Sequence, residues 1–344
     1  MTTATEQRRT PLGLFPDRPV PRLYDRIIEV LGVRHCARRT EEAYLHWIGR
    51  FVLFHDRRHP RQLGEDDVNR FLRHLAVKER VAAAPPNQAL SAILFLYEHV
   101  LEQPLDRIEG VVRARRPKRL PVVLTVDEVS RIMAHLTGDK WLIAMLLYGG
   151  GLRLLEPLRL RVKDLDLQRG EITVREGKGD KDRVTTMPRA VVHRLQEHLQ
   201  RVKRFHEQDV ADGHGRVELP HALARKYPNA NREWAWQYVF PQERRWRNPK
   251  TGEQGRHHID ESLFQRSLKA AVRQAGLSER VTSHTFRHSF ATHLLADGYD
   301  IRTVQELLGH KDVRTTMIYT HVLNRGGRGV RSPADSLACR PGEH

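Results

Sequence analysis

The sequence predicts a mainly α-helical protein with one small β-sheet, an α+β fold, on three observations. Apolar residues recur three or four positions apart, the period of a helix, through residues 21–101 and through most of residues 125–325. Residues 171–188 instead place short apolar runs on both sides of the turn GKGDK, as in a β-hairpin. The 344 residues, 39% of them hydrophobic, are enough for about two domains with packed cores.

The N-terminal part of the chain is expected to be a small helical domain preceded by a flexible arm. Residues 1–20 are polar and interrupted by proline, and the helical domain follows over residues 21–103. Its helices are predicted at residues 40–55, 64–76 and 87–101. Thr40, with two glutamates behind it, has the chemistry of an N-terminal helix cap.

A basic linker is expected over residues 104–124. Charge and proline oppose core formation there, so the segment should be extended. A solvated spacer and a segment that follows a phosphate backbone both fit this composition. The candidates for contact with DNA are Arg115, Arg116, Lys118 and Arg119.

Residues 125–325 form the second predicted domain, and residues 326–344 a loose tail rich in glycine and arginine. Helices are expected at residues 126–136, 141–150, 261–277, 283–298, 300–310 and 312–322. The apolar residues of the hairpin strands are Ile172, Val174, Val184 and Met187. A polar stretch with several tryptophans, at about residues 212–256, interrupts the helices.

The composition favours a nucleic-acid partner over the alternative of an ordinary basic enzyme. Lysine and arginine number 59 against 42 acidic residues, and the net charge of +17 attracts polyanions. No apolar stretch approaches the roughly 20 residues that span a bilayer, and the N-terminus lacks the apolar core of a signal peptide. The two cysteines, Cys36 and Cys339, are far apart in the sequence and fit a reducing compartment. We therefore expect a cytoplasmic protein without a membrane partner.

The stretch SHTFRHSFATHLLADG, residues 283–298, carries the most informative chemistry. An apolar residue at every fourth position makes a buried stripe, and Gly298 can end the helix. His284 and Arg287 project from a neighbouring face, where an imidazole beside a guanidinium suits a phosphate. A metal site is the alternative, since His284 and His288 stand four apart as helical zinc ligands do. Arg287 would repel a cation there and the motif contains no general base, so we expect no metal.

A second stretch, ELLGHKDVRTTMIYTH at residues 306–321, supplies two more groups. Gly309 breaks the preceding helix and leaves His310 at a turn. Tyr319, nine residues on, is expected among polar residues rather than on the apolar face. A phenol is a competent nucleophile toward phosphorus, although a single tyrosine is more often a packing residue.

Two upstream motifs add cations to this set. Arg153 follows the glycines 149–151, which allow close approach of a backbone, and Glu156 can orient it. Lys178 lies in the turn of the hairpin. Because Gly-Lys-Gly lacks the spacing of a nucleotide-binding loop, ATP is not implied.

Together these motifs resemble the catalytic set of the tyrosine recombinases, in order and in local context. The matching residues are Arg153, Lys178, His284, Arg287, His310 and Tyr319. Over about residues 20–335 the chain is most similar to the integron integrases, through stretches such as ARKYPNANREWAWQYVFP and RHHID. The tryptophan-containing stretch has the most weight, because phage integrases and chromosome-dimer resolvases lack that insertion. The glycines 149–151 in place of Thr-Gly, and Pro157 after Glu156, depart from the family pattern.

The resemblance implies the tyrosine recombinase fold, with two domains that form a clamp around DNA. These are a core-binding, SAM-like domain and a catalytic domain that contains the integron-type insertion. It also implies that Tyr319 attacks a scissile phosphate, giving a 3′-phosphotyrosyl link and a free 5′-hydroxyl. A second strand's hydroxyl then reverses the attack, so neither ATP nor another cofactor is needed. A homotetramer assembled on DNA is implied as well.

The other residues of the set have implied roles that agree with their chemistry. Arg153 and Arg287 clamp the non-bridging oxygens as negative charge builds in the transition state. Lys178 is the acid for the departing 5′-oxygen. His284 and His310 share proton transfer and hydrogen-bond the phosphoryl group.

For the subfamily, the resemblance implies gene capture, in which folded single-stranded cassette sites are joined to a double-stranded integration site. Extrahelical bases of such a fold can stack on aromatic side chains, with Trp236 the first candidate platform and Trp234 the second. His257 and His258 are similar to paired histidines that contact a neighbouring base. Packing of the insertion by the tryptophans is the alternative. A recombinase of duplex sites only, and a DNA-binding protein without catalysis, are the other interpretations.

Overall fold

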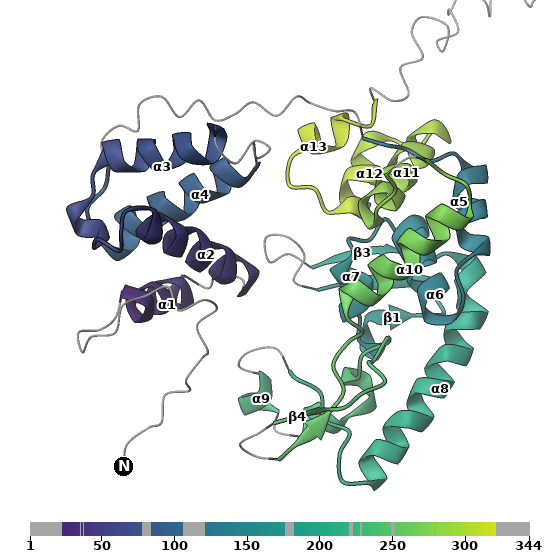
Figure 1. Ribbon diagram of the computed structural model, residues 1–344. Coiled ribbons are helices and arrows are strands. Elements are labelled where there is room, and N and C mark those ends of the chain that lie inside the picture. The colour runs from purple at the N-terminus through teal and green to yellow at the C-terminus, as the bar shows by residue number, and fades with distance from the viewer. Residues whose placement is uncertain are drawn as a thin grey trace, which may run out of the picture. The chain divides into compact units, whose positions relative to one another are not determined.

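The computed structural model describes residues 23–34, 36, 38–77, 84–105, 121–175, 182–219, 223–227, 229–248, 252–278 and 280–320. The chain divides into two compact units, residues 1–118 and 119–344 (Figure 1). Both are mainly helical and the strands gather in small antiparallel sheets, so the predicted fold class is confirmed. In these ranges no helix is long and apolar enough to cross a bilayer. The expected arm and tail, and the predicted site residues Arg115, Arg116, Lys118, Arg119 and Lys178, lie outside the described residues.

The N-terminal unit packs its helices around one apolar core. They are α1 (Leu23–Val33), α2 (Arg38–Phe54), α3 (Glu65–Val77) and α4 (Ala84–Phe95), with a π-helical turn at Leu96–Val100. Fully buried side chains from each helix, Ile27, Phe51, Phe71 and Ile93 among them, meet in this core. The predicted cap at Thr40 is wrong, since α2 begins two residues earlier, where arginines favour helix as strongly as the residues that follow.

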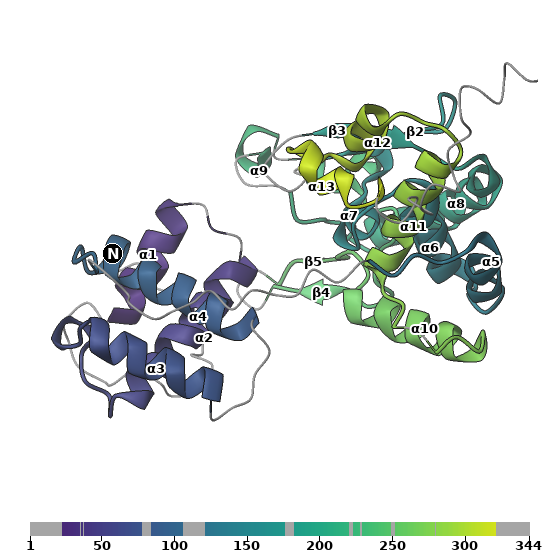
Figure 2. The same cartoon turned by 90° about the horizontal axis from the view of Figure 1, so that it is seen from above.

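The C-terminal unit is larger, and its helix α11 connects the main core to a second cluster. The helices are α5 (Val126–Ala134), α6 (Gly138–Gly149), α7 (Leu155–Arg159), α8 (Val192–Ala211), α9 (Leu223–Lys226), α10 (Glu261–Gln274), α11 (Ser283–Ala296), α12 (Ile301–Leu308) and α13 (Val313–Met317). Helix α11 packs on α6 and lies beside α12 in both views (Figure 1 and Figure 2). Phe286 enters the main core, whereas Phe290 joins Val304 and Leu308 of α12. The predicted apolar stripe of α11 therefore packs into both clusters and fixes the position of this helix.

A three-stranded antiparallel sheet forms at the predicted hairpin. Its strands, in spatial order, are β1 (Leu165–Asp166), β2 (Glu171–Val174) and β3 (Arg183–Thr186). The register pairs Ile172 with Thr185 and Val174 with Arg183. Because side chains alternate between the faces of a strand, Thr185 is buried while its neighbour Val184 is 50% exposed. Val184 therefore adds nothing to the core, although the hairpin itself is confirmed.

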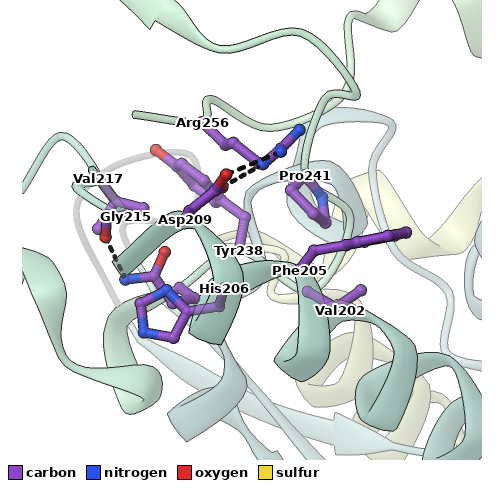
Figure 3. Close-up of a pocket in the computed structure, with 10 residues that line it drawn as sticks. Val202, Phe205, His206, Asp209, Gly215, Val217, Tyr238, Pro241 and Arg256 are labelled. Atoms are coloured by element: carbon purple, nitrogen blue, oxygen red, sulfur yellow. Dashed lines mark hydrogen bonds and ion pairs between the residues drawn. The ribbon is translucent and has the colours of Figure 1, made fainter. Parts of the chain in front are cut away.

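The tryptophan-containing insertion is irregular and is fastened to the unit by buried polar contacts. It contains α9, short 3-10 turns at Ala230–Arg232 and Trp234–Trp236, and the paired strands β4 (Trp246–Arg247) and β5 (Gln254–Gly255). The buried guanidinium of Arg161 donates hydrogen bonds to the carbonyl oxygens of Trp236, at 2.7 Å, and Glu218, at 2.8 Å. Asp209 of α8 accepts two hydrogen bonds from Arg256, at 2.5 and 3.0 Å (Figure 3). The insertion is thus held at both ends.

Candidate active site

Arg287 lies at the centre of the candidate site, and α11 buries it almost completely, leaving 3% of the residue exposed. It donates hydrogen bonds to the carbonyl oxygens of Gly151 and Leu308, the latter at 2.5 Å. Burial, followed by the neighbouring charge of Arg153, lowers the pKa of the guanidinium to about 9, although Glu156 acts to raise it. A pKa of about 9 still leaves Arg287 charged at neutral pH. The site therefore contains a buried cation held by backbone carbonyls.

The glycine run brings one of those carbonyls to Arg287, as its predicted close approach requires. Gly151 has φ 61°, and a Cβ there would lie 2.4 Å from the ring of Phe290. A Cβ on Gly149 would lie 2.1 Å from Pro188. Residues with side chains would push these elements apart. The departure from the family pattern at this run is therefore compatible with a closely packed turn.

Glu156 holds two guanidiniums with one carboxylate. Its oxygens accept hydrogen bonds from the amide of Arg153 at 2.8 Å and from its Nη1 at 2.9 Å, which is the predicted contact. Arg183 of β3 donates two more, at 2.6 and 3.0 Å. Burial alone would raise the pKa of Glu156, but the hydrogen bonds and charges of Arg183 and Arg153 outweigh it and lower the pKa. Glu156 is thus an anion at neutral pH.

His310 follows a left-handed glycine that ends α12. Gly309 has φ 62°, as expected of a helix-breaking residue. The Nε2 atom of His310 lies 3.1 Å from Nη2 of Arg287, and Nδ1 lies 2.9 Å from Oγ1 of Thr316. Burial, followed by the charges of Arg287 and its neighbours, lowers the pKa of His310 to about 4. The ring is therefore neutral at pH 7, and since a guanidinium only donates, Nε2 is the acceptor and Nδ1 carries the proton.

Tyr319 is buried, and the expectation that it lies among polar residues is wrong. The residue is 1% exposed and packs with Phe290, Val304 and Leu308, because the chain turns back toward α11 after the short helix α13. Its hydroxyl lies 3.0 Å from Nδ1 of His288, and its ring stacks parallel to His310 with centroids 6.4 Å apart. Burial raises the pKa of the phenol, whereas Arg287 and Arg153 act to lower it.

His284 and His288, four positions apart on α11, have different surroundings. His288, whose pKa burial lowers to about 4, is the partner of the Tyr319 hydroxyl. His284 is more exposed, and its ring centroid lies 6.4 Å from that of His288. Partial burial, Arg287 and Arg153 lower the pKa of His284. The described members of the predicted set thus share one electrostatic environment.

Two contacting residues were not assigned to the site from the sequence. Arg183 was overlooked, although it follows Lys178 by five positions in the same hairpin. His288 was considered only as a metal ligand. The available signals were a charged residue on a short strand, Arg183, and a histidine without an assigned role in the motif at residues 283–298, His288.

The two candidate tryptophans contact residues of the C-terminal unit outside the insertion. Nζ of Lys163 lies 3.0 Å from the ring centroid of Trp236, covering one face of that ring. The Trp234 ring lies 5.9 Å from that of His206. These contacts agree with the alternative that the tryptophans pack the insertion.

The paired histidines form an aromatic cluster with Tyr238. The rings of His257 and His258 are 4.1 Å apart and lie 5.5 and 5.4 Å from Tyr238. Nδ1 of His258 is 2.8 Å from the carbonyl oxygen of Ile259, and burial lowers the pKa of this histidine to about 4. Nε2 of His257 lies 3.9 Å from a carboxylate oxygen of Glu218.

Comparison with known proteins gives a consistent result. Residues 122–325 match the model of the phage integrase family, and residues 23–107 match the N-terminal SAM-like domain of phage integrases. An integrase/recombinase of Escherichia coli is 50% identical over 96% of this chain and 98% of its own length. Tyrosine recombinase XerA of Thermococcus kodakarensis is 33% identical over 69% of this chain and 71% of its own length.

A solved structure shows the same fold. A lambda integrase dimer bound to a COC′ core site superposes with a TM-score of 0.56 at 17% identity, covering 90% of this chain and 96% of that one. The chain belongs to the phage integrase family of tyrosine recombinases, enzymes that cut and rejoin DNA at specific sites through a phosphotyrosine bond.

Proposed function

We propose that this tyrosine recombinase is an integron integrase, which moves gene cassettes between folded single-stranded cassette sites and a double-stranded integration site. The proposal rests on the inserted segment, in which several aromatic side chains lie around the turn at Trp234–Trp236. Arg161 holds this turn by a hydrogen bond. The aromatic rings belong to Trp234, Trp236, Tyr238, His257 and His258. A folded single strand offers extrahelical bases, and such rings suit base stacking worth about 1–3 kcal/mol per base.

In this proposal the reaction is carried by the predicted catalytic set. The phenol oxygen of Tyr319 attacks the scissile phosphorus, the bond to the 5′-oxygen breaks, and Lys178 gives that oxygen its proton. The proton that the phenol releases can pass to His288, whose Nδ1 lies 3.0 Å from the hydroxyl, and from there toward His284, whose ring centroid lies 6.4 Å from that of His288. The pair Arg153 and Arg287 stabilises charge on the phosphoryl oxygens.

His310 has a supporting part in the same scheme. Its Nε2 accepts a hydrogen bond from Arg287, so a bound phosphate would have this imidazole beside the guanidinium that holds it. Transfer to a second strand's 5′-hydroxyl reverses the first step and restores Tyr319. The energy of the bond is kept in the phosphotyrosyl ester, so the scheme needs no cofactor.

We propose that the protein acts as a larger assembly on DNA. A core-binding domain at residues 21–103 and a catalytic domain at residues 125–325 clamp around DNA, and the basic linker at residues 104–124 follows the phosphate backbone. Four copies assemble on two sites. The reaction takes place in the cytoplasm, where cassettes acquired by horizontal gene transfer are integrated and excised.

A nicked duplex substrate tests the chemistry. Cleavage next to the nick releases a short strand that diffuses away, so the wild-type protein should accumulate a covalent adduct that survives denaturant. Tyr319→Phe should give no adduct, and a chelator should not reduce the wild-type yield. Absence of an adduct from the wild-type protein would refute the catalytic roles.

A paired substrate tests the integron assignment. Trp236→Ala should reduce recombination of a folded single-stranded site more than cleavage of a duplex site. Nζ of Lys163 and Cζ of Arg161 already lie 3.0 and 5.9 Å from the centroid of the Trp236 ring, so a base would stack on the part that they leave open. The matched control is Tyr227→Ala, which removes an exposed ring from the same insertion. Equal losses on both substrates would favour packing by the tryptophan, and activity on duplex sites alone would favour a phage-type or dimer-resolving recombinase.

A further inference from the structure

We propose that Arg183 is a positioning residue that sets both Arg153 and the turn carrying His310, an inference that rests on the catalytic roles proposed above. Its guanidinium makes three hydrogen bonds to the protein. Two go to the carboxylate of Glu156, at 2.6 and 3.0 Å, and the third runs from Nε to the carbonyl oxygen of Leu307, at 3.0 Å.

Exposure separates the roles of the two arginines on this carboxylate. The side chain of Arg183 is 8% exposed, and all three of its guanidinium nitrogens are engaged with protein acceptors. The side chain of Arg153 is 22% exposed and makes one side-chain hydrogen bond to Glu156. Arg153 is therefore the cation that can reach a phosphate, whereas Arg183 acts through its neighbours.

The first of those neighbours is Glu156. A bidentate guanidinium fixes the plane and the rotamer of a carboxylate, because two parallel hydrogen bonds leave little freedom of rotation. Oε1 and Oε2 of Glu156 then meet Nη1 and the amide of Arg153 in one orientation. Without Arg183, the carboxylate would be held from one side only.

The second neighbour is the turn after α12. The carbonyl of Leu307 lies at the C-terminus of that helix, where a cation is favoured by the helix dipole. A Cβ on Gly309 would lie 2.6 Å from Cδ of Arg183, so the side chain packs directly against the turn. The next residue is His310, which contacts Arg287. One side chain thus supports groups on both sides of the phosphate position.

The surroundings of Glu156 contain more positive than negative charge. Apart from the effects of burial, Arg153 and Arg183 lower the pKa of both Glu156 and Arg287, and Glu156 acts to raise that of Arg287, so the three guanidiniums share this one carboxylate. One carboxylate cannot neutralise three cations, and an incoming phosphate supplies the missing negative charge. A misplaced Arg153 would therefore weaken stabilisation of the phosphoryl oxygens rather than general binding of DNA.

The test compares two substrates and a double-mutant cycle in the full-length protein. Arg183→Met should slow single-turnover cleavage of the nicked duplex about 100-fold, while DNA affinity changes less than about threefold. A methylphosphonate at the scissile position carries no charge on the non-bridging atoms, so it needs the guanidiniums less. The defect of Arg183→Met on that substrate should shrink to about tenfold or less. Combined with Arg153→Ala, it should add much less than its full single-variant loss, and what remains comes from the turn that carries His310.

Control variants distinguish a specific role of Arg183 from general loss of folding and from failure of the proposed catalysis. Arg201→Met removes another arginine ion pair, 2.6 Å from Asp139, and should cleave at the wild-type rate. Arg183→Lys keeps the charge without the paired hydrogen bonds, and should show the same substrate pattern with a smaller defect. Equal defects on both substrates, or losses that add in the double variant, would overturn the role of Arg183. No adduct from the wild-type protein would instead overturn the proposed catalysis, and this inference with it.

Discussion

Replacing Glu156 with glutamine removes one negative charge at almost constant shape. The carboxylate receives four hydrogen bonds, at 2.6, 2.8, 2.9 and 3.0 Å, and its side chain is 10% exposed, so water compensates little. The new amide would also turn an N–H group toward a guanidinium that can only donate. Breaking a buried ion pair from one side costs about 3–5 kcal/mol. We expect Glu156→Gln to lower the free energy of unfolding by about that amount.

Urea unfolding followed by fluorescence measures this change, because four of the five tryptophans lie in the C-terminal unit. Glu218→Gln is the matched control, since its side chain is 77% exposed and its loss should change stability by less than about 0.5 kcal/mol. Sulfate should stabilise Glu156→Gln more than the wild-type protein at equal ionic strength, because the unpaired guanidiniums gain an anion. A loss below about 1 kcal/mol, or equal stabilisation by sulfate, would refute this account of the charge cluster.

Three further predictions follow from other contacts. Gly309→Ala should destabilise the fold by at least about 1 kcal/mol more than Gly276→Ala in urea, because both glycines have positive φ but only Gly309 faces Arg183. Between about pH 6.5 and 4, stability should fall, since the pKa of about 4 for His288 and His310 keeps them neutral while the unfolded chain binds protons. The reduction is about 1–3 kcal/mol after allowance for partial exposure, and pH-independent urea midpoints would contradict it. Arg161→Met should speed proteolysis within residues 212–256, because three acceptors lose their donor; unchanged digestion would show that other contacts hold the insertion.

The sequence was sufficient for the secondary structure near the site, because that structure is determined by local patterns. The helical period located α11 and α12, and the turn residues located the hairpin of β2 and β3. Gly309 and the glycines 149–151 were predicted from chemistry that depends on one or two residues. The fold class follows from these elements.

Contacts between distant segments could not be predicted in the same way. Arg183 lies 27 residues from Glu156 and 124 residues from Leu307, so no local pattern connects them. The burial of Tyr319 depends on how the chain after α13 returns to α11, which polar neighbours in sequence do not reveal. Lys163 reaches Trp236 across a separation of 73 positions, so which face of that ring is covered is a tertiary property.

The apolar surroundings of Tyr319 also bear on the fate of the reaction intermediate. The residue is 1% exposed and packs with Phe290, Val304 and Leu308, so these side chains keep water from its ring. Hydrolysis of the phosphotyrosyl ester would leave the DNA broken, whereas transfer of the phosphoryl group to a DNA hydroxyl rejoins it. Packing that keeps water from this ring therefore favours rejoining over hydrolysis of an ester on its oxygen.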